Sequence, residues 1–295
     1  MSTFKYEEGK QYLQPVTFGP CVSPRQNQYG ERFDCTNPIR QEMHSVVFET
    51  DIDQLEAIVP PGFVVRAPYV IANFVGLTNI NWLAGKGYDI HNVYIPVIFE
   101  GKKDHYQGLY NAVMWEGHPD PLITGRDQIA MNKLCGDISW FQPHGELIRA
   151  SISSWDFKFA EMDQFPEEEL DPEAIKELVS IIANPDDQGL FNYRYLPNPE
   201  QPDKAEVEYA TFTPTVIKGD VTWNPPADYD PAAIKQVPVK FCPGRIRWNK
   251  AAWEQLPTTW RVVNTLADLK VKRVVGSAIS VNYSCNDFLT TMRIE

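Results

Sequence analysis

The sequence lacks the short motifs that identify several common enzyme classes. It contains no G-x-G-x-x-G or G-x-x-x-x-G-K-[S/T] loop for nucleotide phosphates, no G-x-S-x-G nucleophile turn and no H-E-x-x-H zinc motif. The chain therefore carries none of the local signatures of a dinucleotide-binding enzyme, a P-loop NTPase, an α/β-hydrolase or a zincin. Any catalytic group must be sought outside these patterns.

Cysteine is scarce and its spacing is uninformative. The chain has 5 cysteines, an odd number, and no two stand at C-x-x-C spacing; they are Cys21, Cys35, Cys135, Cys242 and Cys285. A disulfide framework and a structural zinc site are both weakly supported. We expect free thiols and a cytoplasmic location, with a Cys21–Cys35 bridge as an open alternative.

Positive charge and long apolar runs are also lacking. The formal net charge is -12, and no cluster of lysine and arginine offsets it. A polyanion would be repelled on average, so we expect no nucleic-acid partner. The N-terminal residues have no apolar core, and no stretch of about 18 apolar residues occurs. We therefore expect neither a secretory signal nor a membrane partner.

What the sequence does contain is a regular supply of short strands. The chain has 295 residues with 43% hydrophobic residues, which is ordinary globular composition. Branched and aromatic residues predict strands in 69–83, 92–101, 108–117, 145–160, 206–225, 236–248 and 271–288. Helices are predicted after Thr50 or Asp51, in 171–185 and in 258–269. Since few strands are separated by a crossover helix, a mainly antiparallel α+β fold is favoured.

No shift of composition is sharp enough to divide the chain. We expect one domain over residues 1–295, with an irregular N-terminal arm at about 1–42 and an acidic, proline-bearing insertion at about 161–202.

Two groups of polar residues have spacings that suggest a metal site and an ion-pair strip, respectively. In "EGHPD", Glu116, His118 and Asp120 alternate, as the first ligands of a metal site on a strand would, although the glycine and proline favour a turn. Arg245 and Arg247 alternate around Ile246, and this spacing favours an ion-pair strip on a strand over an anion site.

Lys133 lies in an unusually apolar segment, "GRDQIAMNKLCG". The nearest acids along the chain are Asp127 and Asp137, so we expect no acid to pair with its amine and Lys133→Ala to cause no strong destabilisation. Such a lysine either extends its amine to water or is held where the amine loses its proton. By spacing alone a lysine is far more often a surface group.

The segment resembles the acetoacetate decarboxylase family. In that family a Gly-Arg-Glu precedes an aromatic, a proline and a reactive lysine. Here Gly125 and Arg126 match, Asp127 stands for the glutamate, and Met131 and Asn132 replace the aromatic and the proline. "VVFETDIDQLEAIVPPGF" and "LADLKVKRVVGSAI" resemble other family segments, so that the resemblance covers roughly residues 44–155 and 205–285.

The resemblance implies a fold and a covalent mechanism. The family fold is a closed, mainly antiparallel β-barrel or cone with helices packed outside. Lys133 would be the nucleophile that forms a Schiff base, and burial would lower its pKa, because Leu134 supplies no neighbouring cation. No cofactor is required, and we expect a homo-oligomer that binds a small keto acid or related carbonyl compound.

The family's other polar positions carry over poorly. Its substrate-carboxylate arginine falls on Gln41, with Arg40 beside it, and its two pocket glutamates fall on Asn73 and Ile90. We take Gln41, Asn73, Arg40 and Met131 as candidate substrate-binding residues, with Gln41 and Asn73 facing the same cavity as Lys133. The resemblance implies decarboxylation of a β-keto acid other than acetoacetate; an aldolase or dehydratase using the same imine, and a non-catalytic binding protein, stay open.

Overall fold

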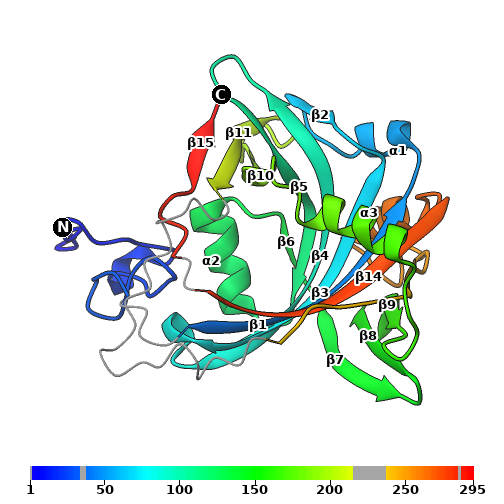
Figure 1. Cartoon of the computed structure of the whole chain (residues 1–295). Coiled ribbons are helices and arrows are strands. Elements are labelled where there is room, and N and C mark those ends of the chain that lie inside the picture. The colour runs from blue at the N-terminus through cyan, green and yellow to red at the C-terminus, as the bar shows by residue number, and fades with distance from the viewer. Residues whose placement is uncertain (1, 34–37, 215–236, 285–286) are drawn as a thin grey trace.

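The computed structural model describes residues 2–33, 38–214, 237–284 and 287–295. These residues form two β-sheets with a few short helices, so the α+β class is confirmed (Figure 1). Among them, no helix is long and apolar enough to cross a membrane.

The larger sheet has eleven strands, most of them antiparallel to their neighbours. Its main path runs β12-β14-β1-β3-β4-β5-β10-β11-β15, while β2 pairs with β4 and β6 with β5. The strands are β1 (Ile39–Glu49), β2 (Phe63–Val65), β3 (Tyr69–Ile80), β4 (Lys86–Glu100), β5 (His105–Glu116), β6 (Lys133–Cys135), β10 (Gly189–Pro197), β11 (Ala205–Pro214), β12 (Lys240–Cys242), β14 (Arg273–Ser284) and β15 (Met292–Ile294). No ladder among the described residues joins β12 to β15, so closure into a barrel or cone is not confirmed.

The smaller sheet has four antiparallel strands. Its order is β13-β9-β8-β7, with β7 (Asp137–His144), β8 (Leu147–Ser154), β9 (Phe157–Gln164) and β13 (Gly244–Trp248). The parts of the predicted strands in 215–225, at 236 and at 285–286 lie outside the described residues. The expected acidic insertion, 161–202, holds the end of β9, one helix and β10, and β10 pairs with β5 and β11 in the larger sheet.

The described residues also form four α-helices, three of which were predicted. They are α1 (Ile52–Glu56), α2 (Pro119–Ile129), α3 (Pro172–Ile182) and α4 (Trp260–Ala267). Asp171 caps α3 as expected, accepting hydrogen bonds from the backbone N–H groups of Glu173 and Ala174. Helix α2 was not predicted, because two prolines and a glycine interrupt its helical pattern.

Alternation along β3 separates the two faces of the larger sheet. Val70, Ala72 and Phe74 point into the main core, which also takes residues of the smaller sheet and of α4. Ile71, on the other face, packs with residues of α3, while Val75 lies further along that face in a separate cluster beside Met131. A fully buried valine, isoleucine or phenylalanine side chain contributes about 1.5–3 kcal/mol to folding. The core therefore fixes the sheet from one side and leaves its other face to α3, α2 and a cavity.

Candidate functional site

A cavity of about 190 Å³ lies on the face of the larger sheet that Val75 occupies, where α2 covers it. Its wall is mainly apolar, and the polar side chains in the wall come from six different helices and strands. The lining includes Ile39, Gln41, Val75, Leu77, Trp82, Tyr88, Ile90, Asn92, Tyr94, Met114, Glu116, Thr124, Gly125, Ile129, Met131, Lys133, Leu190, Ser284 and Phe288. An apolar cavity with a few convergent polar groups is the usual form of a small-molecule site.

Lys133 reaches this cavity from β6, a short strand that follows α2. It pairs with Met114 of the parallel strand β5, and its backbone carbonyl accepts a hydrogen bond of 2.6 Å from Arg126 Nη1. The residue is only 4% exposed. The expectation that Lys133 points into the interior from the segment after Gly125 is therefore met.

Gly125 makes room for the lysine side chain. A Cβ atom added at Gly125 would lie 2.5 Å from Cε of Lys133 and closer still to Nζ. Because Gly125 lies on α2 with no side chain of its own, the end of Lys133 can lie directly against the helix backbone. The matching glycine of the family motif thus has a steric role in this chain.

The amine of Lys133 has a buried acidic partner that the sequence analysis did not find. Nζ lies 2.6 Å from Oε1 of Glu116, whose side chain is 0% exposed, and it donates a 2.9 Å hydrogen bond to the carbonyl of Pro121. The expectation that no acid pairs with Lys133 is wrong. It considered only neighbours in the sequence, whereas Glu116 ends the adjacent strand β5 and lies two residues from Met114, on the same face.

Burial shifts both members of this pair toward their neutral forms. Desolvation lowers the pKa of Lys133, and the nearby Glu116 only partly opposes that shift. Desolvation also raises the pKa of Glu116, and Lys133 only partly opposes it. Both changes reduce the free energy needed to move a proton from the ammonium to the carboxylate. Oε2 of Glu116 is buried without a hydrogen-bond partner among the described residues.

Two of the other candidate residues line the cavity and two do not. Gln41 and Met131 are in its wall. Asn73 lies on the cavity side of β3, but it is behind the wall, where its Nδ2 donates a 2.7 Å hydrogen bond to Asn92 Oδ1. Arg40 alternates with Gln41 on β1, points to the opposite face and pairs with Glu42 at 2.7 Å.

The expectation that Asn73 faces the cavity is therefore corrected, and Asn92 takes its place. Asn92 pairs with Asn73 across β3 and β4, and it is 4% exposed. Ile90, at the second glutamate position, does line the cavity, whereas the adjacent His91 points into the main core.

The sequence did contain a pattern that could have identified Glu116 as a site residue. On a strand Glu116 shares a face with Met114, so it is an acid in an otherwise apolar strand.

The three residues of the hypothetical metal site, Glu116, His118 and Asp120, do not come together. Glu116 is buried beside Lys133, whereas His118 is the N-cap of α2, with its Nδ1 accepting from the backbone N–H of Asp120 at 3.3 Å. Within the described ranges, no group of three or more His, Cys, Asp or Glu side chains could hold a metal ion. Cys21, Cys135 and Cys242 are free cysteines; Cys35 and Cys285 lie outside those ranges.

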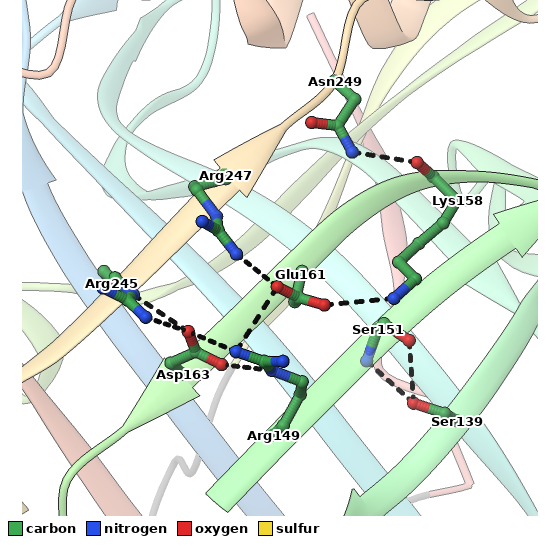
Figure 2. Close-up of polar contacts among 9 residues, drawn as sticks. All are labelled: Ser139, Arg149, Ser151, Lys158, Glu161, Asp163, Arg245, Arg247 and Asn249. Atoms are coloured by element: carbon green, nitrogen blue, oxygen red, sulfur yellow. Dashed lines mark hydrogen bonds and ion pairs between the residues drawn. The ribbon is translucent and has the colours of Figure 1, made fainter. Parts of the chain in front are cut away.

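The arginines of β13 form the expected ion-pair strip on the smaller sheet. Figure 2 shows Arg245 beside Asp163, at 2.7 Å between Nη2 and Oδ2, and Arg247 paired with Glu161. Arg149 of β8 also binds Asp163, at 2.6 Å. Every arginine in this strip has a carboxylate partner, so the strip holds strands β8, β9 and β13 together rather than offering an anion site.

The profile of the acetoacetate decarboxylase (ADC) family matches residues 20–291. The match covers most of the chain, and the protein belongs to this family. A comparison with curated protein sequences finds no match.

Solved structures of this family share the fold at low sequence identity. Acetoacetate decarboxylase from Legionella pneumophila is 16% identical, with a TM-score of 0.60 over 90% of this chain and 91% of that one. An acetoacetate decarboxylase-like enzyme from Sphingomonas wittichii is also 16% identical, with a TM-score of 0.59 over 88% and 92%. The enduracididine biosynthesis enzyme MppR, complexed with pyruvate, is 15% identical, with a TM-score of 0.57 over 88% and 95%. The chain thus shares its fold with acetoacetate decarboxylase and with MppR.

Proposed function

We propose that this protein is a lyase that works through a covalent imine between Lys133 and a carbonyl substrate. The observation that carries the proposal is the buried pair of Lys133 and Glu116, 2.6 Å apart, at the wall of a mainly apolar cavity. A buried ion pair adds little net stability compared with apolar residues of similar size, so a role in chemistry accounts for its presence better than a role in folding.

Glu116 supplies and removes the protons that imine formation needs. The Lys133 ammonium first gives a proton to the Glu116 carboxylate, and the neutral amine then adds to the substrate carbonyl. After the proton moves from nitrogen to oxygen, the adduct is a carbinolamine. Protonated Glu116 donates its proton to the carbinolamine hydroxyl, and water leaves. The products of this step are a protonated imine on Lys133 and a Glu116 carboxylate 2.6 Å from where the amine lay, as its counter-ion.

The protonated imine is an electron sink that several reactions can use. Loss of carbon dioxide from a β-carboxylate leaves an enamine on Lys133. The same sink supports retro-aldol cleavage or dehydration when a hydroxyl group stands at the β carbon. Family membership favours carbon–carbon bond cleavage of a small carbonyl compound.

The alternative is a binding protein of the same fold whose lysine does not react. Incubation with a small ketone and borohydride, followed by intact-mass spectrometry, separates the two. We expect the wild-type protein to gain one reduced adduct and Lys133→Arg to gain none, because a guanidinium stays protonated and forms no imine. Equal labelling of the two proteins would contradict the proposal.

A further inference from the structure

We infer that the substrate is an uncharged carbonyl compound, which means that it carries no carboxylate group. The inference rests on the proposed imine chemistry of Lys133 and deepens it. It comes from a count of charges in the cavity wall. Among the described residues that line the cavity, the charged side chains are Lys133 and Glu116 alone. Their charges cancel, and the remaining lining is apolar, aromatic, amide or hydroxyl.

The charge of the site stays balanced through the reaction only when the substrate is neutral. In the free site, the pair is either ammonium with carboxylate or amine with carboxylic acid, and both sum to zero. After imine formation the protonated imine faces the Glu116 carboxylate, and the sum is again zero. A substrate carboxylate would add one negative charge at every stage, beside a glutamate that is 0% exposed. Burying a charge without a partner is strongly unfavourable.

Two arginines, Arg25 and Arg126, directly follow residues of the cavity wall in the sequence. Arg25 follows Pro24 of the cavity wall, but its guanidinium donates hydrogen bonds to the carbonyls of Gln128 at 3.3 Å and Phe288 at 2.6 Å. Arg126 donates to the carbonyl of Lys133, outside the cavity wall. Neither arginine is among the described residues that line the cavity.

Two amide side chains in the wall suit a neutral polar group instead. Gln41 and Asn92 both line the cavity, on β1 and β4, the two strands that flank β3 in the larger sheet. The amide nitrogen of Gln41 has only a weak contact, 3.9 Å from Met43 Sδ, so it is available to a substrate oxygen. An amide can donate to a carbonyl or accept from a hydroxyl without bringing in a charge. The inferred substrate is therefore a neutral ketone or aldehyde with a second oxygen function, and its imine serves aldol-type cleavage or dehydration.

The test compares two probes that differ only in charge. Acetoacetamide and acetoacetate have almost the same shape, and both form imines with an amine. Each is incubated with the protein and borohydride, and the rate of covalent labelling is measured by intact-mass spectrometry. Each rate is divided by the labelling rate of N-acetyl-lysine in the same solution, which removes the difference in intrinsic reactivity. We expect acetoacetamide to label the protein at least tenfold faster.

A smaller preference, or a preference for acetoacetate, would overturn this inference while leaving the imine mechanism intact. Labelling by neither probe would overturn the mechanism itself.

Gln41→Arg supplies a second test, because it adds a cation to the cavity wall. We expect it to reduce the preference for acetoacetamide by at least tenfold. Gln201→Arg, which makes the same change of charge on an exposed loop, should leave the preference unaltered; if the two variants behave alike, the charge of the cavity does not select the substrate.

Discussion

Nζ of Lys133 lies 2.6 Å from Oε1 of Glu116, and both side chains are buried, with Glu116 the last residue of β5 and Lys133 the first residue of the parallel strand β6. Each residue is the only charged neighbour of the other in the described lining of the cavity. The protonation state of one therefore depends on the other, and replacing either residue changes the pKa of its partner.

Lys133→Ala should destabilise the fold, contrary to the expectation drawn from an unpaired lysine. Glu116 would lose its counter-charge, which now partly offsets the effect of burial, so its pKa would rise further. A carboxyl group with a folded-state pKa above its unfolded value lowers stability as the pH rises past the unfolded pKa. We expect a loss of about 3–5 kcal/mol in the free energy of unfolding at about pH 8, and a smaller loss at about pH 5.5.

Urea unfolding at the two pH values measures this effect. The double variant Lys133→Ala with Glu116→Gln is the matched control, and it should recover part of the stability at the higher pH, because no charge is left buried. A loss that is equal at both pH values would contradict the coupling of Lys133 and Glu116.

Glu116→Gln should slow imine formation and shift its pH dependence. Glu116 raises the pKa of Lys133, so its removal lowers that pKa further and the amine becomes neutral at lower pH. The acid limb of the pH profile of labelling should move to lower pH, while the maximal rate falls by about 10²–10⁴-fold through loss of the proton donor. Asp120→Asn, on the exposed start of α2, should change neither property. An unshifted profile in Glu116→Gln would show that Glu116 does not control the amine.

Gly125→Ala should disturb the site while sparing the fold. The added methyl group would collide with Nζ and Cε of Lys133, which form the flexible end of a side chain, so the amine would move away from Glu116. We expect near-native thermal unfolding and at least a tenfold slower labelling of Lys133, since about 1 Å of misplacement costs on the order of 10²-fold. Gly117→Ala is the control, because the closest atom to its added Cβ would be 3.8 Å away. Fast labelling of Gly125→Ala would contradict the role assigned to Gly125.

His91 should make the protein sensitive to acid. Its ring is fully buried between Phe74 and Trp115, and desolvation lowers its pKa to about 4. A base whose folded pKa lies below its unfolded value near 6.5 stabilises the fold above that value. The contribution is lost as the pH falls toward 4, and its full size is about 3 kcal/mol.

His91→Phe keeps the stacking and removes the titration. We expect it to flatten the fall in the free energy of unfolding between about pH 6.5 and about pH 4, measured in urea. His105→Gln, on an exposed histidine, should keep the wild-type slope. If His91→Phe keeps that slope too, other groups govern acid unfolding.

The sequence could reveal the strands and the lysine but not the environment of the lysine. Alternation and β-branched residues predicted β3, β4, β5 and β14, because these patterns depend on local burial. The single strand expected over 145–160 is instead the antiparallel pair β8 and β9. Helix α2 was missed, since Pro119, Pro121 and Gly125 obscure a helical pattern that tertiary contacts with β5 and β6 stabilise.

The pairing of Lys133 with Glu116 depends on strand order, which no local pattern encodes. The two residues are brought together by the parallel pairing of β5 and β6, across the whole of α2. The same reason explains the misplacement of Asn73. By its position in the alternation of β3, Asn73 is on the same face as the cavity. However, Asn92 on the next strand lies between Asn73 and the cavity and accepts its hydrogen bond. Family resemblance located the nucleophile; only the register of the strands identified its partner.

The central claim is that Lys133 is the nucleophile, and peptide mapping of the reduced adduct tests it most directly. The wild-type protein is labelled with acetoacetamide and borohydride to about one adduct per chain, digested, and sequenced by tandem mass spectrometry. The account predicts that the adduct lies on the peptide containing Lys133, at the one lysine whose buried amine is held beside Glu116. An adduct spread over exposed lysines, with Lys133 unmodified, would contradict it.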